Sequence, residues 1–67
     1  MQVKPGDLVE YGPFARTGAH GLGLVLRVEP NGSGEQMAEV LWAKYPGDGP
    51  QWYQAKNLRV ASSSEEV

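Results

Sequence analysis

The chain has 67 residues, one histidine and no cysteine, which fits one small domain and excludes a disulfide scaffold, a thiolate zinc site and a metal site built from histidines. Its formal charge is −2, but Glu65 and Glu66 are two of the eight acidic residues, and the other six balance the six basic ones. Because this neutral body attracts nucleic acids and anionic lipids only weakly, the expected partner is a larger protein subunit or another copy of the chain, not nucleic acid or a membrane.

Turn-forming residues divide the chain into five short segments. Nine glycines and five prolines are spaced so closely that no clean window remains for a ten-residue helix. The segments between the turns are rich in branched and aromatic residues and have the length of strands. We therefore predict an all-β fold with strands at residues 7–11, 22–29, 36–43, 51–54 and 58–61.

The second of these segments lies in the longest apolar stretch, GLGLVLRVEP at residues 21–30. A nucleotide-binding glycine loop would need a third glycine or a following Lys-Ser/Thr pair, and then a helix, and none of these is present. The segment begins apolar on both sides, which is typical of a strand that bends to serve two sheets, and its glycine marks the bend or a close backbone approach. The alternate aliphatics Leu22, Leu24, Leu26 and Val28 are expected to fill the interior.

The third segment, QMAEVLWA, has a period of two. Ala38, Val40 and Trp42 share one face, which is entirely apolar, whereas the other face carries a glutamate. We predict Val40 at the centre of the core, with Trp42 beside it.

The connections between the predicted strands differ in length in an informative order. About ten residues join the first two strands, two hairpin connections follow, and residues 55–57 leave room for only one helical turn. This is the element order of SH3-like barrels, in which five antiparallel strands curl and protect their edges. The prediction is a single five-stranded SH3-like barrel over residues 1–61, with one short helical turn before the last strand, and a flexible C-terminal tail at residues 62–67.

Four segments carry a family resemblance: KPGDLVEY, GLGLVLRV, AEVLW and WYQAKNLRV. Over residues 3–61 the chain resembles SH3-like and KOW-like small barrels, and the combination is similar to short uncharacterised proteins of bacteriophages. The resemblance implies a fold, and it implies little about function because one small barrel hosts many activities. The loop GPFARTGAH lacks the acidic residues expected of a domain that binds proline-rich peptides, and the neutral body differs from basic RNA-binding KOW modules.

Aromatic residues form the first candidate site. Trp52 and Tyr53 are adjacent on a strand, so their side chains point to opposite faces and one of them lies outside. An outward aromatic group could form a peptide groove, a methyl-lysine cage or a subunit contact, or it could cover one end of the barrel. The candidate protein-contact residues are Tyr11, Phe14, Tyr45, Trp52 and Tyr53.

Basic residues form the alternative site. Arg27 and Arg59 are expected on the outer faces of their strands, with Lys56 in the turn before the last strand. If the second and fifth strands pair, these three residues form a positive patch, which would suit a nucleic-acid-associated or host-regulatory module. Otherwise they are solvated, with Glu29 and Glu39 as neutralising neighbours.

No catalytic centre can be assembled from the sequence. His20 lies in the long first loop, without a nucleophile or carboxylate partner that the sequence places beside it. No apolar run is long enough for a membrane span, and MQVKPGD is not followed by the apolar core of a signal peptide. We therefore expect no enzyme, metal or cofactor, but a protein-interaction module made in a host cytoplasm. It is expected to be a minor bacteriophage virion component, such as a capsid-stabilising, connector or tail-associated protein.

Overall fold

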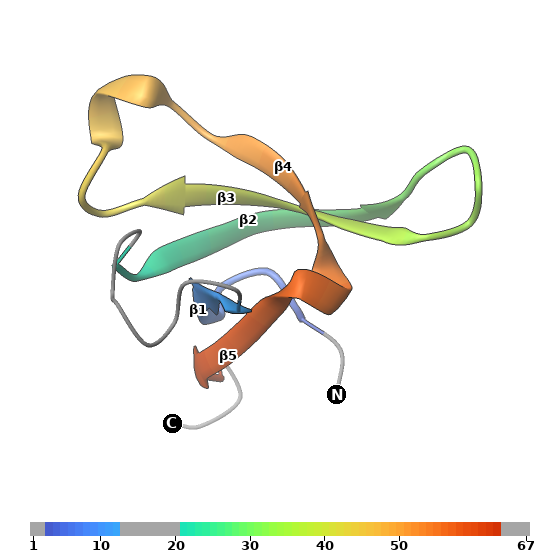
Figure 1. Cartoon of the computed structure of the whole chain (residues 1–67), viewed down its shortest axis with the longest axis horizontal. Coiled ribbons are helices and arrows are strands. Elements are labelled where there is room, and N and C mark those ends of the chain that lie inside the picture. The colour runs from blue at the N-terminus through green and yellow to red at the C-terminus, as the bar shows by residue number, and fades with distance from the viewer. Residues whose placement is uncertain (1–2, 13–20, 64–67) are drawn as a thin grey trace.

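The computed structural model describes residues 3–12 and 21–63. They form one antiparallel sheet of five strands with two 3₁₀ turns (Figure 1). The elements are β1 (Leu8–Tyr11), β2 (Gly23–Pro30), β3 (Gln36–Trp42), the turn η2 (Pro46–Asp48), β4 (Gln51–Gln54), the turn η3 (Ala55–Asn57) and β5 (Leu58–Ser62). The all-β prediction and the helical turn before the last strand are confirmed, and each strand boundary lies within one residue of its predicted position.

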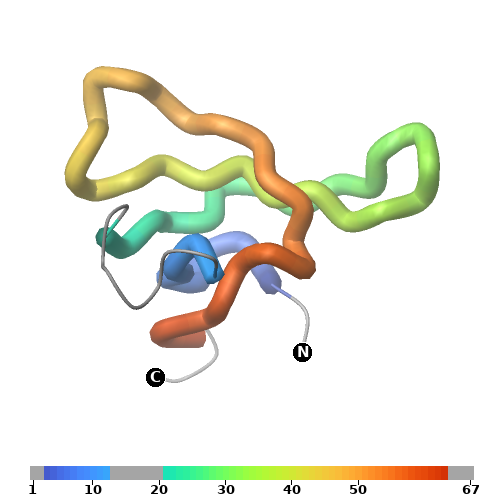
Figure 2. The backbone as a smooth tube through the Cα atoms, viewed as in Figure 1, coloured from blue at the N-terminus to red at the C-terminus, as the bar shows by residue number. Residues whose placement is uncertain are grey.

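The strand order in space is β4-β3-β2-β1-β5. β2 and β3 form the longest hairpin, whose tip projects from one side of the molecule (Figure 2). β1 and β5 pair with each other and lie below this hairpin in Figure 1. β4 and β5 are the two edges, so the sheet of the described residues is open. Ser62, the first residue of the predicted tail, belongs to β5, and residues 64–67 lie outside the described part of the chain.

The core lies on the inner face of this sheet. The face predicted for the third strand is confirmed, because Ala38, Val40 and Trp42 are all buried. Burying a side chain of the size of valine contributes about 1.5–3 kcal/mol relative to leaving it in water. The buried hydrophobic residues are Val3, Val9, Val25, Ala38, Val40, Trp42 and Leu58.

The predicted orientation of the first half of β2 is wrong. Val25 is 1% exposed and faces the core, whereas Leu24 is 39% exposed. A Cβ at Gly23 would lie 2.3 Å from Val40 Cγ1 and 2.7 Å from Trp42 Cε3. Position 23 therefore faces inward without a side chain, because Val40 and Trp42 fill the space that a side chain there would need. The close contacts at this glycine are thus made by side chains of the neighbouring strand.

A β-bulge changes the orientation of β2 beyond this point. The register against β3 shifts between Val25 and Arg27, which leaves Leu26 as the extra residue. Such a bulge interrupts the alternation of inward and outward side chains. Arg27 is exposed, as predicted, and Val28 packs against the core. The three leucines predicted in the interior are instead exposed: Leu22, Leu24 and Leu26.

A buried carboxylate holds the turn that leads into β1. Asp7 is 1% exposed, and its Oδ2 accepts a hydrogen bond of 2.8 Å from the Lys4 N–H. The Asp7 N–H donates to the Lys4 carbonyl at 3.1 Å, across Gly6, whose φ of 92° favours glycine. The Val25 N–H donates to the Asp7 carbonyl at 3.0 Å, so a backbone hydrogen bond joins the turn to β2.

Asp7→Ala is expected to lower the free energy of unfolding by about 2 kcal/mol, because it removes the buried carboxylate that accepts the Lys4 N–H. Asp48→Ala removes an exposed carboxylate from η2 and should change stability by less than about 0.5 kcal/mol. Urea denaturation of both variants measures the difference. Equal midpoints would contradict a structural role for the Asp7 carboxylate.

Candidate functional site

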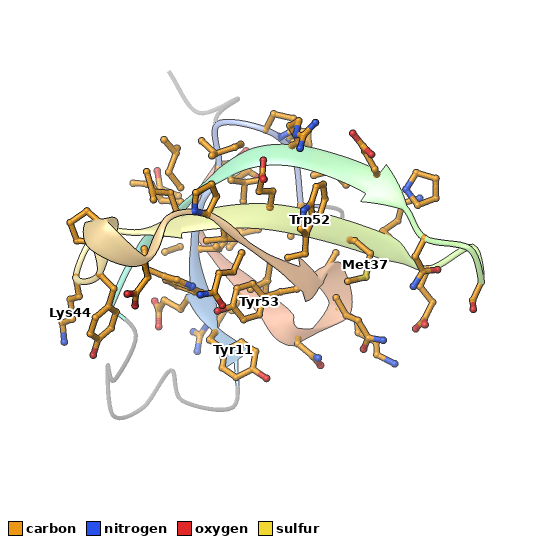
Figure 3. All side chains as sticks on the ribbon, turned by 90° about the horizontal axis from the view of Figure 1, so that it is seen from above. Tyr11, Met37, Lys44, Trp52 and Tyr53 are labelled. Carbon is orange, nitrogen blue, oxygen red and sulfur yellow. The ribbon has the colours of Figure 1, made fainter. Side chains whose placement is uncertain are left out.

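The predicted aromatic contact residues are divided between the two faces of the sheet. Trp52 is exposed on the outer face, whereas Tyr53 and Tyr11 pack against the core. Figure 3 shows Tyr53 next to Tyr11, with Trp52 apart from both. Tyr45 is exposed in the connection between β3 and β4. Phe14 lies outside the described residues, as does His20.

The inward aromatics form a cluster with polar contacts of its own. The Trp42 Nε1–H donates a hydrogen bond of 3.0 Å to the Tyr53 hydroxyl, and the two rings meet edge to face with centroids 5.6 Å apart. The centroid of the Tyr11 ring lies 5.5 Å from the centroid of the Tyr53 ring. A buried indole N–H needs a hydrogen-bond acceptor. The Tyr53 hydroxyl provides this acceptor for Trp42, and the Tyr53 ring packs against the core. In this structure Tyr11 and Tyr53 contribute to the core.

The three basic residues of the alternative site do not share one stretch of sheet. The patch required the second and fifth strands to pair, and this condition is not met, because β1 lies between β2 and β5. Arg27 and Arg59 are therefore on strands separated by a third. The register places Arg59 opposite Glu10 on β1, so a residue of opposite charge lies beside it.

Arg27 and Lys56 also lie next to carboxylates. Arg27 Nε donates to Glu39 Oε1 at 3.1 Å, and Arg27 Nη1 lies 3.7 Å from Glu29 Oε2. The hydrogen bond and the charge of Glu39 raise the pKa of Arg27 above its ordinary value. Lys56 Nζ lies 3.6 Å from Glu35 Oε2. These neighbours reduce the positive potential that a polyanion would meet.

Leucines on the outer face form a candidate site that the sequence pattern did not predict. Leu8 on β1 pairs with Leu24 on β2, which pairs with Leu41 on β3. Directly opposed residues of antiparallel strands place their side chains on the same face, about 4.5–5.5 Å apart. The three leucines therefore form a row across three strands. We call this row, with Leu22 and Leu26 on either side of Leu24 along the chain, the leucine surface.

The leucine surface is apolar and accessible. Four of its members are 37–43% exposed, and Leu41 is half-buried. Single exposed leucines are ordinary, but a contiguous apolar group on a soluble protein commonly marks an interaction site. The sequence contained one signal for this surface. Residues 22–26 are apolar on both faces of a strand, and a core that lies on one face of the sheet leaves the other apolar face exposed.

The described residues offer little for other chemistry. They contain no group of three or more His, Cys, Asp or Glu side chains that could hold a metal ion. Over residues 3–12 and 21–63, no helix has both the length and the apolar character that a membrane span requires. Comparison with known proteins found no matching family model, curated protein or solved structure.

Proposed function

We propose that this protein is a non-enzymatic interaction module that binds a larger protein subunit through the leucine surface. The observation that carries the proposal is the row formed by Leu8, Leu24 and Leu41, which leaves apolar side chains in water on the face of the sheet opposite the core. Removing apolar surface from water contributes about 25 cal/mol per Å². A partner with an apolar patch of matching shape would therefore gain affinity at this face.

The proposed architecture is an SH3-like barrel, a finer class than the open five-stranded sheet. Its support is the strand order β4-β3-β2-β1-β5, the 3₁₀ turn between β4 and β5, and the bulge that bends β2. The first residues of β2 pair with both β1 and β3, whereas the residues after the bulge pair with β3. A bend between these two parts lets the sheet curl over its core.

The proposed setting is a bacteriophage particle, in which the protein serves as a minor capsid-stabilising, connector or tail-associated component after synthesis in the host cytoplasm. Its support is the resemblance of the chain to short phage proteins, together with the small neutral body and the leucine surface. A small domain gains stability by assembly onto a larger structure.

Leu24→Lys is expected to reduce the amount of this protein that co-sediments with phage particles by about tenfold or more. The substitution places a charge at the centre of the leucine surface, where burial against a partner would leave that charge unpaired. Ser33→Lys adds the same charge in the exposed turn between β2 and β3 and should not change co-sedimentation. Density-gradient centrifugation of particles assembled with each variant measures the effect, and circular dichroism verifies that both variants are folded.

Equal co-sedimentation of the two variants would show that the leucine surface is not the contact. A wild-type protein that stays monomeric and does not co-sediment with particles would refute the virion role itself.

A further inference from the structure

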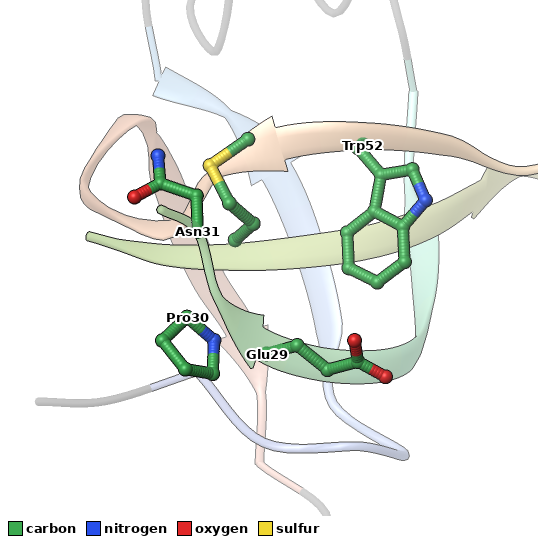
Figure 4. A pocket seen from close by; sticks show the side chains of 5 residues that line it. Glu29, Pro30, Asn31 and Trp52 are labelled. Atoms are coloured by element: carbon green, nitrogen blue, oxygen red, sulfur yellow. The ribbon is translucent and has the colours of Figure 1, made fainter. Parts of the chain in front are cut away.

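An open cleft lies on the outer face of the sheet, near the tip of the β2–β3 hairpin. Its volume is about 200 Å³, and it is lined by Glu29, Pro30, Asn31, Met37 and Trp52. Figure 4 shows Trp52 on β4 across the cleft from Pro30 and Asn31, with the Glu29 side chain extending toward the indole. The walls are thus mainly apolar, and a carboxylate lies at the rim.

The tryptophan in this wall already holds one cation. The guanidinium carbon of Arg27 lies 5.3 Å from the centroid of the Trp52 ring, within the range of about 6 Å over which an indole attracts a positive charge. Glu39, which is opposite both residues in the register, accepts the hydrogen bond from Arg27. The structure therefore shows that this part of the sheet is chemically suited to a cation beside an aromatic ring.

The charges around the cleft do not cancel. Arg27 is the single guanidinium between two carboxylates, those of Glu39 at 3.1 Å and Glu29 at 3.7 Å. This group of three residues carries one net negative charge. The longer of the two contacts belongs to Glu29, the carboxylate that lines the cleft, and its side chain is 57% exposed. It is therefore accessible to a second cation.

We propose that this cleft binds a lysine side chain of a partner protein. The alkyl stem packs against Trp52, Met37 and Pro30, and the ammonium group pairs with the Glu29 carboxylate at the rim. A carboxylate ligand would meet a net negative charge, and a purely apolar side chain would partly desolvate Glu29 without pairing it. The cleft is distinct from the leucine surface, so the inference does not depend on the proposed function.

The experiment uses the full chain and three capped tripeptides, acetyl-Ala-Lys-Ala-amide and its counterparts with norleucine or glutamate at the centre. Norleucine reproduces the lysine stem without the charge. The readout is the indole N–H resonance of exposed Trp52 in ¹H–¹⁵N spectra at constant ionic strength, with the buried Trp42 indole as the internal control. We expect the lysine peptide to shift the Trp52 signal saturably, with a Kd about threefold or more below that of the norleucine peptide, and to leave Trp42 unmoved.

Two variants locate the charge that matters. Glu29→Gln should raise the Kd of the lysine peptide to that of the norleucine peptide, whereas Glu10→Gln removes the same charge from β1 and should leave the Kd unchanged. Added NaCl should weaken the lysine peptide alone. The inference is overturned if the lysine peptide leaves Trp52 unshifted, if the norleucine or glutamate peptide binds equally well or better, or if the two variants behave alike.

Discussion

Gly23→Ala is expected to lower the free energy of unfolding by about 3 kcal/mol, the upper end of the usual cost of overpacking a core. The new Cβ would lie 2.3 Å from Val40 Cγ1, 2.7 Å from Trp42 Cε3 and 2.9 Å from Trp42 Cζ3. Both neighbours are buried, so neither can move aside into solvent. A domain of this length has a total stability of about 3–10 kcal/mol, and one methyl group would therefore remove a large part of it.

Urea denaturation followed by tryptophan fluorescence measures this loss. Gly32→Ala is the matched control, because a Cβ at Gly32 meets nothing within 4 Å and its φ is outside the left-handed region. Val40→Ala removes the atom of closest approach, so the double variant should lose less stability than the two single variants combined. If Gly23→Ala proved as stable as Gly32→Ala, the inward orientation of position 23 would be wrong.

Val25→Lys is expected to unfold the chain, whereas Leu24→Lys, at the preceding position, should change the free energy of unfolding by less than about 0.5 kcal/mol. Val25 is 1% exposed, so a lysine in its place would bury an unpaired ammonium group, which costs more than about 4 kcal/mol. Leu24 is 39% exposed, and a lysine there reaches water. The same amino acid is introduced in both variants, so the comparison isolates the face of the strand.

Circular dichroism and the dispersion of amide resonances distinguish a folded from an unfolded chain for each variant. The reverse result, with Leu24→Lys unfolded and Val25→Lys folded, would restore the alternation that the sequence predicts. It would also eliminate the leucine surface, because Leu24 is the member that joins Leu8 to Leu41.

The aromatic and basic candidates show how much of the candidate site the local sequence pattern could predict. That Trp52 and Tyr53 lie on opposite faces could be predicted from the pleat of a strand. Which of them lies outside could not, because both are large and carry a polar atom. Tyr53 lies inside, where its hydroxyl accepts the Trp42 N–H. The outward position of Arg27 was predicted correctly, but its separation from Arg59 depends on β1, which the topology inserts between their strands.

The sequence by itself determined the five strands, the turn before the last of them and the inner face of β3. Closely spaced turn residues limit the length of every strand, and the strict alternation in β3 leaves a single apolar face. In β2 both faces are apolar from residue 22 to residue 26, so the alternation allows either face to be buried, although the leucine face carries more apolar surface. Only the tertiary structure decided between them. Val40 and Trp42 on the neighbouring strand leave space for no side chain at position 23, so glycine faces inward and the leucines around it face the solvent.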